Sequence, residues 1–206
     1  MYFIVTVYMF HYCSDLIAYL TSMAHTFCIF TVFMWVPSLL TVMKESGGAL
    51  PTGLVFSAFM LSMTLGGMLF ALLLPIFPGG AEGLCVLVYF VAACAMTVPI
   101  IRFEFWYMIV SFLILEAMVG MFNSCGATLR SRYYPEGLQS SIMSVFRLPL
   151  NLLVVIGTKL TDQANNIESL SYVFSVLVLM HLLAMLLQCA LLWYSPANSN
   201  DKIKKH

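Results

Sequence analysis

Two residues of opposite charge lie in the middle of apolar segments, Glu116 in FLILEAMVGMF and Arg147 in SIMSVFRLPLN. A charged side chain at the centre of a bilayer costs about 2.5–3.5 kcal/mol on insertion scales, and such residues face protein or water rather than lipid. Glu116 and Arg147 are therefore the first candidates for a function. Arg147 either lines a cavity and contacts a substrate or serves only as the structural partner of the carboxylate.

The segment that contains Arg147 carries more polar residues at helical spacing. The intervals are 4, 3, 4 and 7 residues between Ser140, Ser144, Arg147, Asn151 and Thr158. At about 100° per residue, these side chains share one face of a helix. Pro149 removes a backbone donor close to Arg147, which favours a kink beside a cavity.

The segment that contains Glu116 has a matching face. Its members follow at three- and four-residue steps: Glu116, Gly120, Asn123 and Ala127. The small residues permit close contact with another helix. Glu116 lies roughly 21 Å before Arg130 along a helix, and Arg147 lies roughly 15 Å after Gly137. An arginine side chain covers this difference in depth, so we expect an ion pair between Glu116 and Arg147.

The composition defines the class of protein that must position these residues. Of 206 residues, 62% are hydrophobic and only 9% are charged, whereas soluble domains carry about 25% charged residues. We therefore predict an all-α integral membrane protein that crosses the bilayer several times. The net charge of +0 gives no reason to expect a nucleic-acid partner.

The sequence contains no GxSxG, HExxH or Walker A pattern, so we do not expect an enzyme. The six cysteines occur singly, which argues against a disulfide framework or a metal site. Buried, reduced thiols are the better interpretation of these cysteines. We expect no cofactor and no bound metal.

Six apolar stretches reach the length of about 20 residues that a membrane-spanning helix needs. They are Leu16–Met43, Thr52–Leu74, Ala81–Ile101, Phe105–Leu129, Gly137–Leu160 and Leu170–Tyr194. Residues 1–15 form an apolar lead of uncertain role, and residues 195–206 form a basic tail. The predicted domain is thus a single six-helix unit, 16–194.

Six spans place both termini on one side of the membrane. That side then carries five basic residues, Arg130, Arg132, Lys202, Lys204 and Lys205, and the other side carries Lys44, Arg102 and Lys159. The excess of positive charge favours cytoplasmic termini. The short connection that contains Arg130, Arg132 and Glu136 is then a cytoplasmic turn.

Other positions have a structural and a functional interpretation. His25 lies in the first span and is either a proton carrier or a hydrogen-bonded structural histidine. We expect His181 and Gln188, which share a face, to be structural. The small residues Ala58, Ser62 and Gly66 are typical of helix packing. Pro37 is expected to bend the first span near its end.

The central residues also match a known pattern, E-x3-G-x9-R-x-[KR]-x2-P-E-x10-R-x-P-L. Its fixed positions here are Glu116, Gly120, Arg130, Arg132, Pro135-Glu136, Arg147 and Pro149-Leu150. With this spacing the chain resembles the C-terminal six-helix half of the molybdate-anion transporter family, within the major facilitator superfamily. The resemblance extends over nearly the whole chain beyond about residue 15.

The resemblance implies twelve helices in two halves, with uptake of molybdate between them by alternating access, and a location in the plasma membrane. The candidates for substrate contact are the polar residues of the spans, with Arg147 as the anion contact and Glu116 holding or gating it; they are Arg147, Glu116, Asn151, Ser144, Asn123 and His25. The partners would be molybdate or a related oxyanion, the lipid bilayer, and either a missing N-terminal half or a second copy of the chain. The alternatives are a major facilitator for another small solute and a truncated membrane protein that does not transport.

The chain departs from the family at three places. His25 stands where the family has a carboxylate, which puts proton or charge handling there in question. Ser124 replaces a proline, so the fourth helix should be straighter. The loop from Pro75 to Glu82 has no lysine or arginine, whereas the family's loop is basic.

Overall fold

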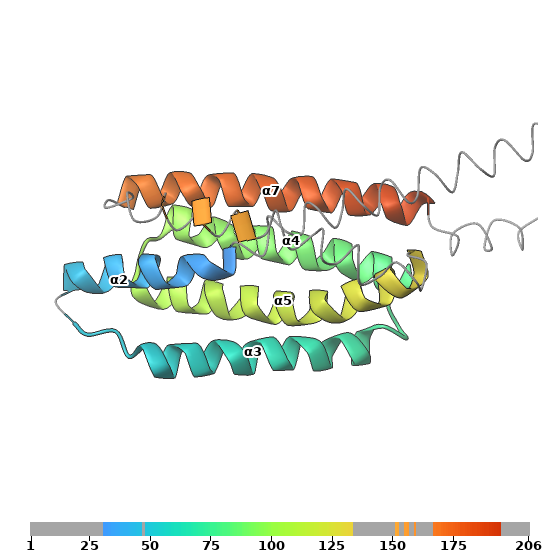
Figure 1. The fold of residues 1–206 in the computed structure, drawn as a ribbon, viewed down its shortest axis with the longest axis horizontal. Coiled ribbons are helices and arrows are strands. Elements are labelled where there is room, and N and C mark those ends of the chain that lie inside the picture. Colours follow the sequence, from blue (N-terminus) through green and yellow to red (C-terminus); the bar gives the residue numbers. More distant parts are fainter. Residues whose placement is uncertain are drawn as a thin grey trace, which may run out of the picture.

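The computed structural model describes residues 31–46, 48–133, 151, 152, 155, 156, 159 and 167–194. All regular elements within these residues are helices: η1 (Thr31–Met34), α2 (Trp35–Ser46), α3 (Thr52–Leu73), α4 (Gly80–Ile101), α5 (Phe105–Tyr133) and α7 (Ile167–Tyr194). Figure 1 shows the long helices side by side, with their axes along one common direction. The predicted N-terminal lead and basic tail lie outside the described residues.

Four of these helices are long and apolar enough to cross a membrane, namely α3, α4, α5 and α7. They correspond to four of the six predicted spans, and they support a membrane protein whose described part is all-helical. The first predicted span is described only from Thr31 onward, and most of the fifth, Gly137–Leu160, lies outside the described residues. The number six therefore stays a prediction.

Helix α5 lies in the interior of the described bundle. It packs against α3 on one side and α4 on the other, and α7 packs against the far side of α4 (Figure 1). The most apolar 18-residue stretch of α3 is only 17% buried, against 50% for α4. Leucines such as Leu54, Leu61 and Leu72 point outward from α3, as expected for side chains that face lipid.

Helices α3 and α5 approach each other very closely because each has a glycine at the contact. A Cβ atom on Gly66 would stand 1.8 Å from the carbonyl oxygen of Ala117, and one on Gly120 would stand 1.8 Å from that of Met63. Ser62 donates a hydrogen bond of 2.6 Å to the Leu113 carbonyl across the same contact. The predictions that Ser62 and Gly66 serve packing, and that Gly120 permits close contact, are confirmed.

The apolar core falls into two clusters along the bundle. One cluster contains Phe59, Phe112 and Leu115, and the other contains Leu84, Met121 and Cys125. Along α5, the buried members of the first cluster end at Leu115 and those of the second begin at Met121, and Met118 packs against both clusters. Glu116 and Gly120 thus lie at the junction of the two clusters.

A tight turn joins α3 to α4, as the Pro78-Gly79-Gly80 sequence predicts. Gly79 has φ 83° and Gly80 has φ 61°, a left-handed conformation that glycine adopts without steric cost. A Cβ on Gly79 would also stand 2.8 Å from Cδ1 of Leu192 in α7. The turn is therefore packed beneath the C-terminal end of α7.

The end of α5 differs from the prediction. We placed the end of this span at Leu129 and put Arg130 and Arg132 in a turn, but α5 continues to Tyr133 and carries both arginines in its last turn. Arginine favours helices, and positive charge is stabilised at a helix C-terminus. No helix-breaking residue occurs before Pro135. The helix also runs without interruption through Ser124, as expected from the absence of proline there.

One prediction stays open and one needs correction. Pro37 is the third residue of α2, just after the change from 3-10 to α geometry at Met34 and Trp35, and the bend predicted there stays a prediction because the span is described only from Thr31 onward. The described cysteines are all free, but only Cys85 and Cys125 are buried; Cys94 and Cys189 are exposed. A lipid-facing surface accepts an apolar thiol as readily as the core does, so burial could not be inferred.

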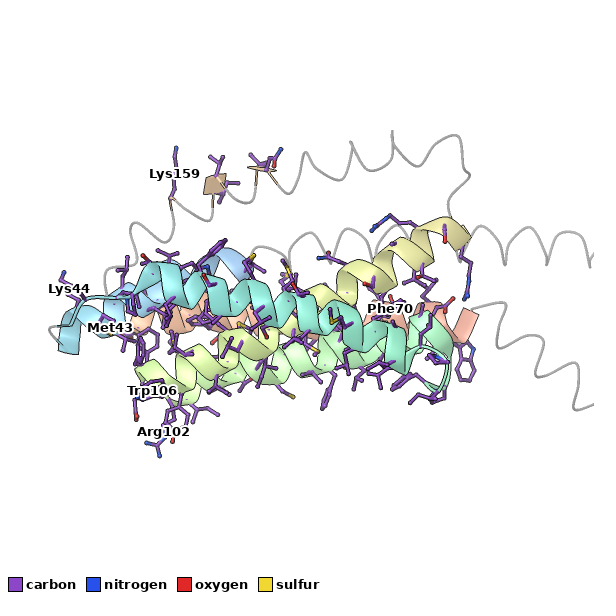
Figure 2. The ribbon with its side chains drawn as sticks, turned by 90° about the horizontal axis from the view of Figure 1, so that it is seen from below. Met43, Lys44, Phe70, Arg102, Trp106 and Lys159 are labelled. Atoms are coloured by element: carbon purple, nitrogen blue, oxygen red, sulfur yellow. The ribbon has the colours of Figure 1, made fainter. Side chains whose placement is uncertain are left out.

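The described basic residues form two groups, one at each end of the bundle. Lys44, Arg102 and Lys159 lie toward the same end in Figure 2, whereas Arg130 and Arg132 lie in the last turn of α5. Because α5 begins just after Arg102, its last turn is at the opposite end. The predicted grouping holds for these five residues, and which end faces the cytoplasm stays a prediction.

Candidate functional site

Glu116 is a buried carboxylic acid in the interior of a membrane-spanning helix. It lies eleven residues after the start of α5, roughly 17 Å along the axis, and its exposed fraction is 1%. No described residue donates a hydrogen bond to its Oε2 atom. Buried carboxylates normally have donors because burial of a charge without a partner is costly. A group of this kind is suited to hold a cation, a proton or an arginine.

Glu116 begins a row of polar side chains along α5, which we call the polar track. Its members are Glu116, Asn123 and Arg130, and successive members are seven residues apart. Two helical turns separate them, so they share one face at intervals of roughly 10 Å. Glu116 is buried, Arg130 is half-buried and Asn123 is exposed. The track thus runs from the interior of the protein toward the end of α5.

Small residues separate the polar side chains on this face of α5, which α3 covers at Gly120 and which is exposed at Asn123 and Ala127. Gly120 lies between Glu116 and Asn123 at the close contact with α3, and Ala127 lies between Asn123 and Arg130. The predicted common face of Glu116, Gly120, Asn123 and Ala127 is consistent with the single continuous helix. An exposed amide at this depth is unfavourable against lipid, so the face is expected to meet water, solute or another protein segment.

A second polar group lies at the C-terminal end of α5, and we call it the end cluster: Glu82, Arg132 and Gln188. The Nη1 atom of Arg132 donates to Oε1 of Glu82 at 2.5 Å. Nε2 of Gln188 donates to the backbone carbonyl of Glu82 at 3.2 Å. Glu82 is completely buried, and 44% of the Arg132 side chain is exposed. The end cluster connects α4, α5 and α7 through one acidic residue.

Glu82 was missed as a site residue because the sequence places it next to a glycine turn. An acidic residue in the first turn of a helix is usually a favourable partner for the helix dipole and nothing more. The antiparallel arrangement of α4 and α5 is the signal that could have identified Glu82 as a partner of the arginines at the end of α5. It brings an acid in the first turn of one helix to the same end as two arginines in the last turn of the other.

The surroundings of His181 support the predicted structural interpretation. Its Nδ1 atom lies 2.8 Å from the carbonyl oxygen of Leu177. A carbonyl only accepts hydrogen bonds, so Nδ1 carries the proton and donates. His181 is also buried. Gln188, on the same face, is held by its bond to Glu82, so the structural interpretation of both residues is supported.

Several predicted site residues lie outside the described residues, so their contacts stay predictions: Arg147, Ser144, Glu136 and His25. Asn151 is described and exposed. The structure brings Glu116, Asn123 and Arg130 onto one face, and it separates Arg132 from them by pairing it with Glu82. No group of three or more His, Cys, Asp or Glu side chains among the described residues is arranged to hold a metal.

A curated relative shows partial similarity to this chain. It is a molybdate-anion transporter from Takifugu rubripes, 30% identical over 132 residues, which cover 61% of this chain and 26% of that protein. The chain thus matches about a quarter of the length of this relative. No family model and no solved structure matches. Together with the four apolar helices, the similarity supports a membrane protein related to a transporter.

Proposed function

We propose that this chain is one half of a membrane transporter for a tetrahedral oxyanion, with molybdate as the substrate. The observation that carries the proposal is the buried Glu116, at the junction of two apolar clusters, on a helix face that continues through Asn123 to Arg130. The resemblance of the Glu116–Leu150 motif and the similarity to a molybdate-anion transporter supply the substrate. The chain moves a solute and does not convert one.

The proposed mechanism is alternating access between two six-helix halves, as in the major facilitator superfamily. The second half is either the remainder of a longer protein or a second copy of this chain. The substrate passes between the halves as they rock, and the end of the bundle that carries Arg130 and Arg132 faces the cytoplasm. The protein acts in the plasma membrane, with both termini in the cytoplasm.

In this proposal Arg147 contacts the anion, because a guanidinium offers several donors in the geometry that an oxyanion accepts. Glu116 holds Arg147 in place when no anion is bound. Asn123, Asn151, Ser144 and His25 line the path and offer hydrogen bonds or a proton. Each role is assigned by the position of the residue on a polar helix face or in the shared motif.

Uptake of molybdate tests the proposal. Cells deficient in molybdate uptake would express this chain, alone or together with the part of the Takifugu relative that the chain does not match. Cellular molybdenum is then measured by mass spectrometry. We expect accumulation above the empty vector in at least one of the two arrangements, and a sharp fall for Arg147→Ala, with Arg147→Lys in between.

Two outcomes would contradict the proposal. Molybdenum at the empty-vector level in both arrangements, with the chain present in the membrane, would exclude transport of this anion. Wild-type uptake by both Arg147 variants would remove Arg147 from the mechanism. The DNA sequence upstream of Met1 separates the two arrangements, because six further apolar spans in frame would supply the second half.

A further inference from the structure

The two arginines at the end of α5 have different surroundings. Arg132 forms the ion pair with Glu82. Arg130, two residues earlier, has no carboxylate within ion-pair distance among the described residues. The two side chains point in directions about 200° apart around the helix, so Arg130 belongs to the face of Glu116 and Asn123 and Arg132 does not. Among the described residues, the charge of Arg130 thus has no acidic partner.

The guanidinium of Arg130 lies back along α5 toward the interior of the membrane. A Cβ atom on Gly126 would stand 3.0 Å from Nη1 of Arg130, so the guanidinium lies beside a residue one turn closer to Glu116. Side chains on an α-helix lean toward its N-terminus, which explains this direction. Gly126 leaves the space that the guanidinium occupies. Arg130 is half-buried in this position.

Asn123 is one turn further into the membrane from Gly126, on the same polar track. Its amide is exposed, and no described residue forms a hydrogen bond with it. The track therefore presents, in order from the end of α5, a guanidinium and then an amide donor. These are the groups that bind tetrahedral oxyanions in proteins. The carboxylate of Glu116 follows roughly 10 Å deeper.

We propose that Arg130, with Asn123, forms a second oxyanion contact at the end of the track, separate from the contact assigned to Arg147. This inference rests on the proposed function and adds an entry or exit site for the same anion. The ligand class is a tetrahedral oxyanion. Two sources share this chemistry, a free anion such as molybdate and the phosphate of a lipid headgroup.

The test is equilibrium binding of molybdate to the purified full chain, measured by calorimetry in two environments. One is a maltoside micelle, which contains no phosphate, and the other is a phospholipid nanodisc. The variants are Arg130→Gln and Gly126→Ala. The matched controls are Arg132→Gln, an arginine already paired, and Gly53→Ala, where an added Cβ meets nothing within 4 Å.

For Arg130→Gln we expect the Kd for molybdate to rise about tenfold, the loss expected for one charge-assisted hydrogen bond. Gly126→Ala keeps the charge but displaces the guanidinium, so the Kd should rise about two- to threefold. Gly53→Ala should leave the Kd unchanged, and Arg132→Gln should do so once corrected for the folded fraction. An equal wild-type Kd in micelles and nanodiscs assigns the site to the free anion. A Kd that is weaker in nanodiscs, with the difference abolished by Arg130→Gln, assigns it to the headgroup phosphate.

A wild-type Kd in Arg130→Gln would overturn this inference and leave the proposed function intact. An equal loss of affinity in Arg130→Gln and Arg132→Gln would also overturn it, because the effect would then be one of total charge. If the wild-type chain binds no molybdate in either environment and supports no uptake, both the inference and the proposed function fail.

Discussion

The end cluster and the polar track place the same kinds of side chain in opposite situations. In the end cluster, the carboxylate of Glu82 is completely buried and is bonded to Arg132. In the polar track, the carboxylate of Glu116 is almost as deeply buried, yet it forms no ion pair with any described residue. Each region contains an acid, an arginine and an amide. Only in the end cluster do described residues bond all three together.

This difference separates structural from functional polar groups in a membrane. A buried carboxylate that is paired with an arginine of another helix connects the two helices, and removing either partner is costly. A buried acid without an ionic partner and an amide exposed at membrane depth are costly unless something binds them. We therefore expect the end cluster to hold α4, α5 and α7 together, and the polar track to be the part that the proposed function gives to the solute.

The largest loss of stability should come from removing Arg132, the partly exposed member of the end cluster. Arg132→Gln leaves the Glu82 carboxylate buried without its cation, which should destabilise the protein by about 3 kcal/mol. Glu82→Gln leaves Arg132, which still reaches solvent, so the cost should be about 1 kcal/mol. Unfolding curves in detergent measure both. Equal costs would contradict the expected difference between the buried acid and the half-exposed arginine.

The next effect concerns the predicted ion pair between Glu116 of the polar track and Arg147. Glu116→Gln alone should lower molybdate uptake roughly ten- to hundredfold, the range that a charged hydrogen bond of 1.5–3 kcal/mol represents. The double variant Glu116→Gln/Arg147→Gln should be less impaired in membrane insertion and folding, because no lone charge remains at membrane depth. A fully active single variant beside an inactive double variant would rule out the pairing.

A smaller effect should follow from the exposed amide of the track. Asn123→Leu should lower uptake about fivefold, near the value of one hydrogen bond of about 1 kcal/mol, while thermal stability stays within about 0.5 kcal/mol. Thr64→Leu is the matched control: Thr64 is exposed on α3 and bonds only to the Met60 carbonyl of its own helix. Loss of uptake in both variants would show that bulk, and not the amide, is responsible.

The smallest effect sets the baseline for the others. Arg102 and Glu104 form an ion pair of 3.7 Å with side chains that are 64% and 61% exposed. Solvent screens such pairs, so Glu104→Gln should change the free energy of unfolding by less than about 0.5 kcal/mol. A change as large as that of Arg132→Gln would remove the distinction between buried and exposed pairs on which the comparison depends.

The sequence predicted the helices best where local chemistry ends them. Predicted Thr52–Leu74 and observed Thr52–Leu73 agree because Pro75 and the Gly79-Gly80 turn stop α3. The predicted span Ala81–Ile101 agrees with the observed helix α4, Gly80–Ile101. Its start is set by the same glycine turn, and its end is set by the polar residues Arg102 and Glu104 that follow. The end of α5 was missed because arginine marks a membrane boundary without ending a helix.

The candidate site was predictable only in part. Spacing alone placed Glu116, Gly120 and Asn123 on one face, since an α-helix has a fixed period. It could not show that Arg132 has a partner in Glu82, because that contact joins residues fifty positions apart on two helices. The different surroundings of Arg130 and Arg132 depend on helix packing, which a single sequence does not specify.

The glycine pair between α3 and α5 has a consequence for the comparison of sequences. A Cβ at Gly66 or Gly120 would overlap a backbone carbonyl of the neighbouring helix. A substitution by a larger residue at either position therefore requires the two helices to separate. The pair therefore acts as a reference mark for alignment. A distant sequence aligned correctly in both helices should show glycine at both positions, and one that shows a bulky residue at either is out of register or packs these helices differently.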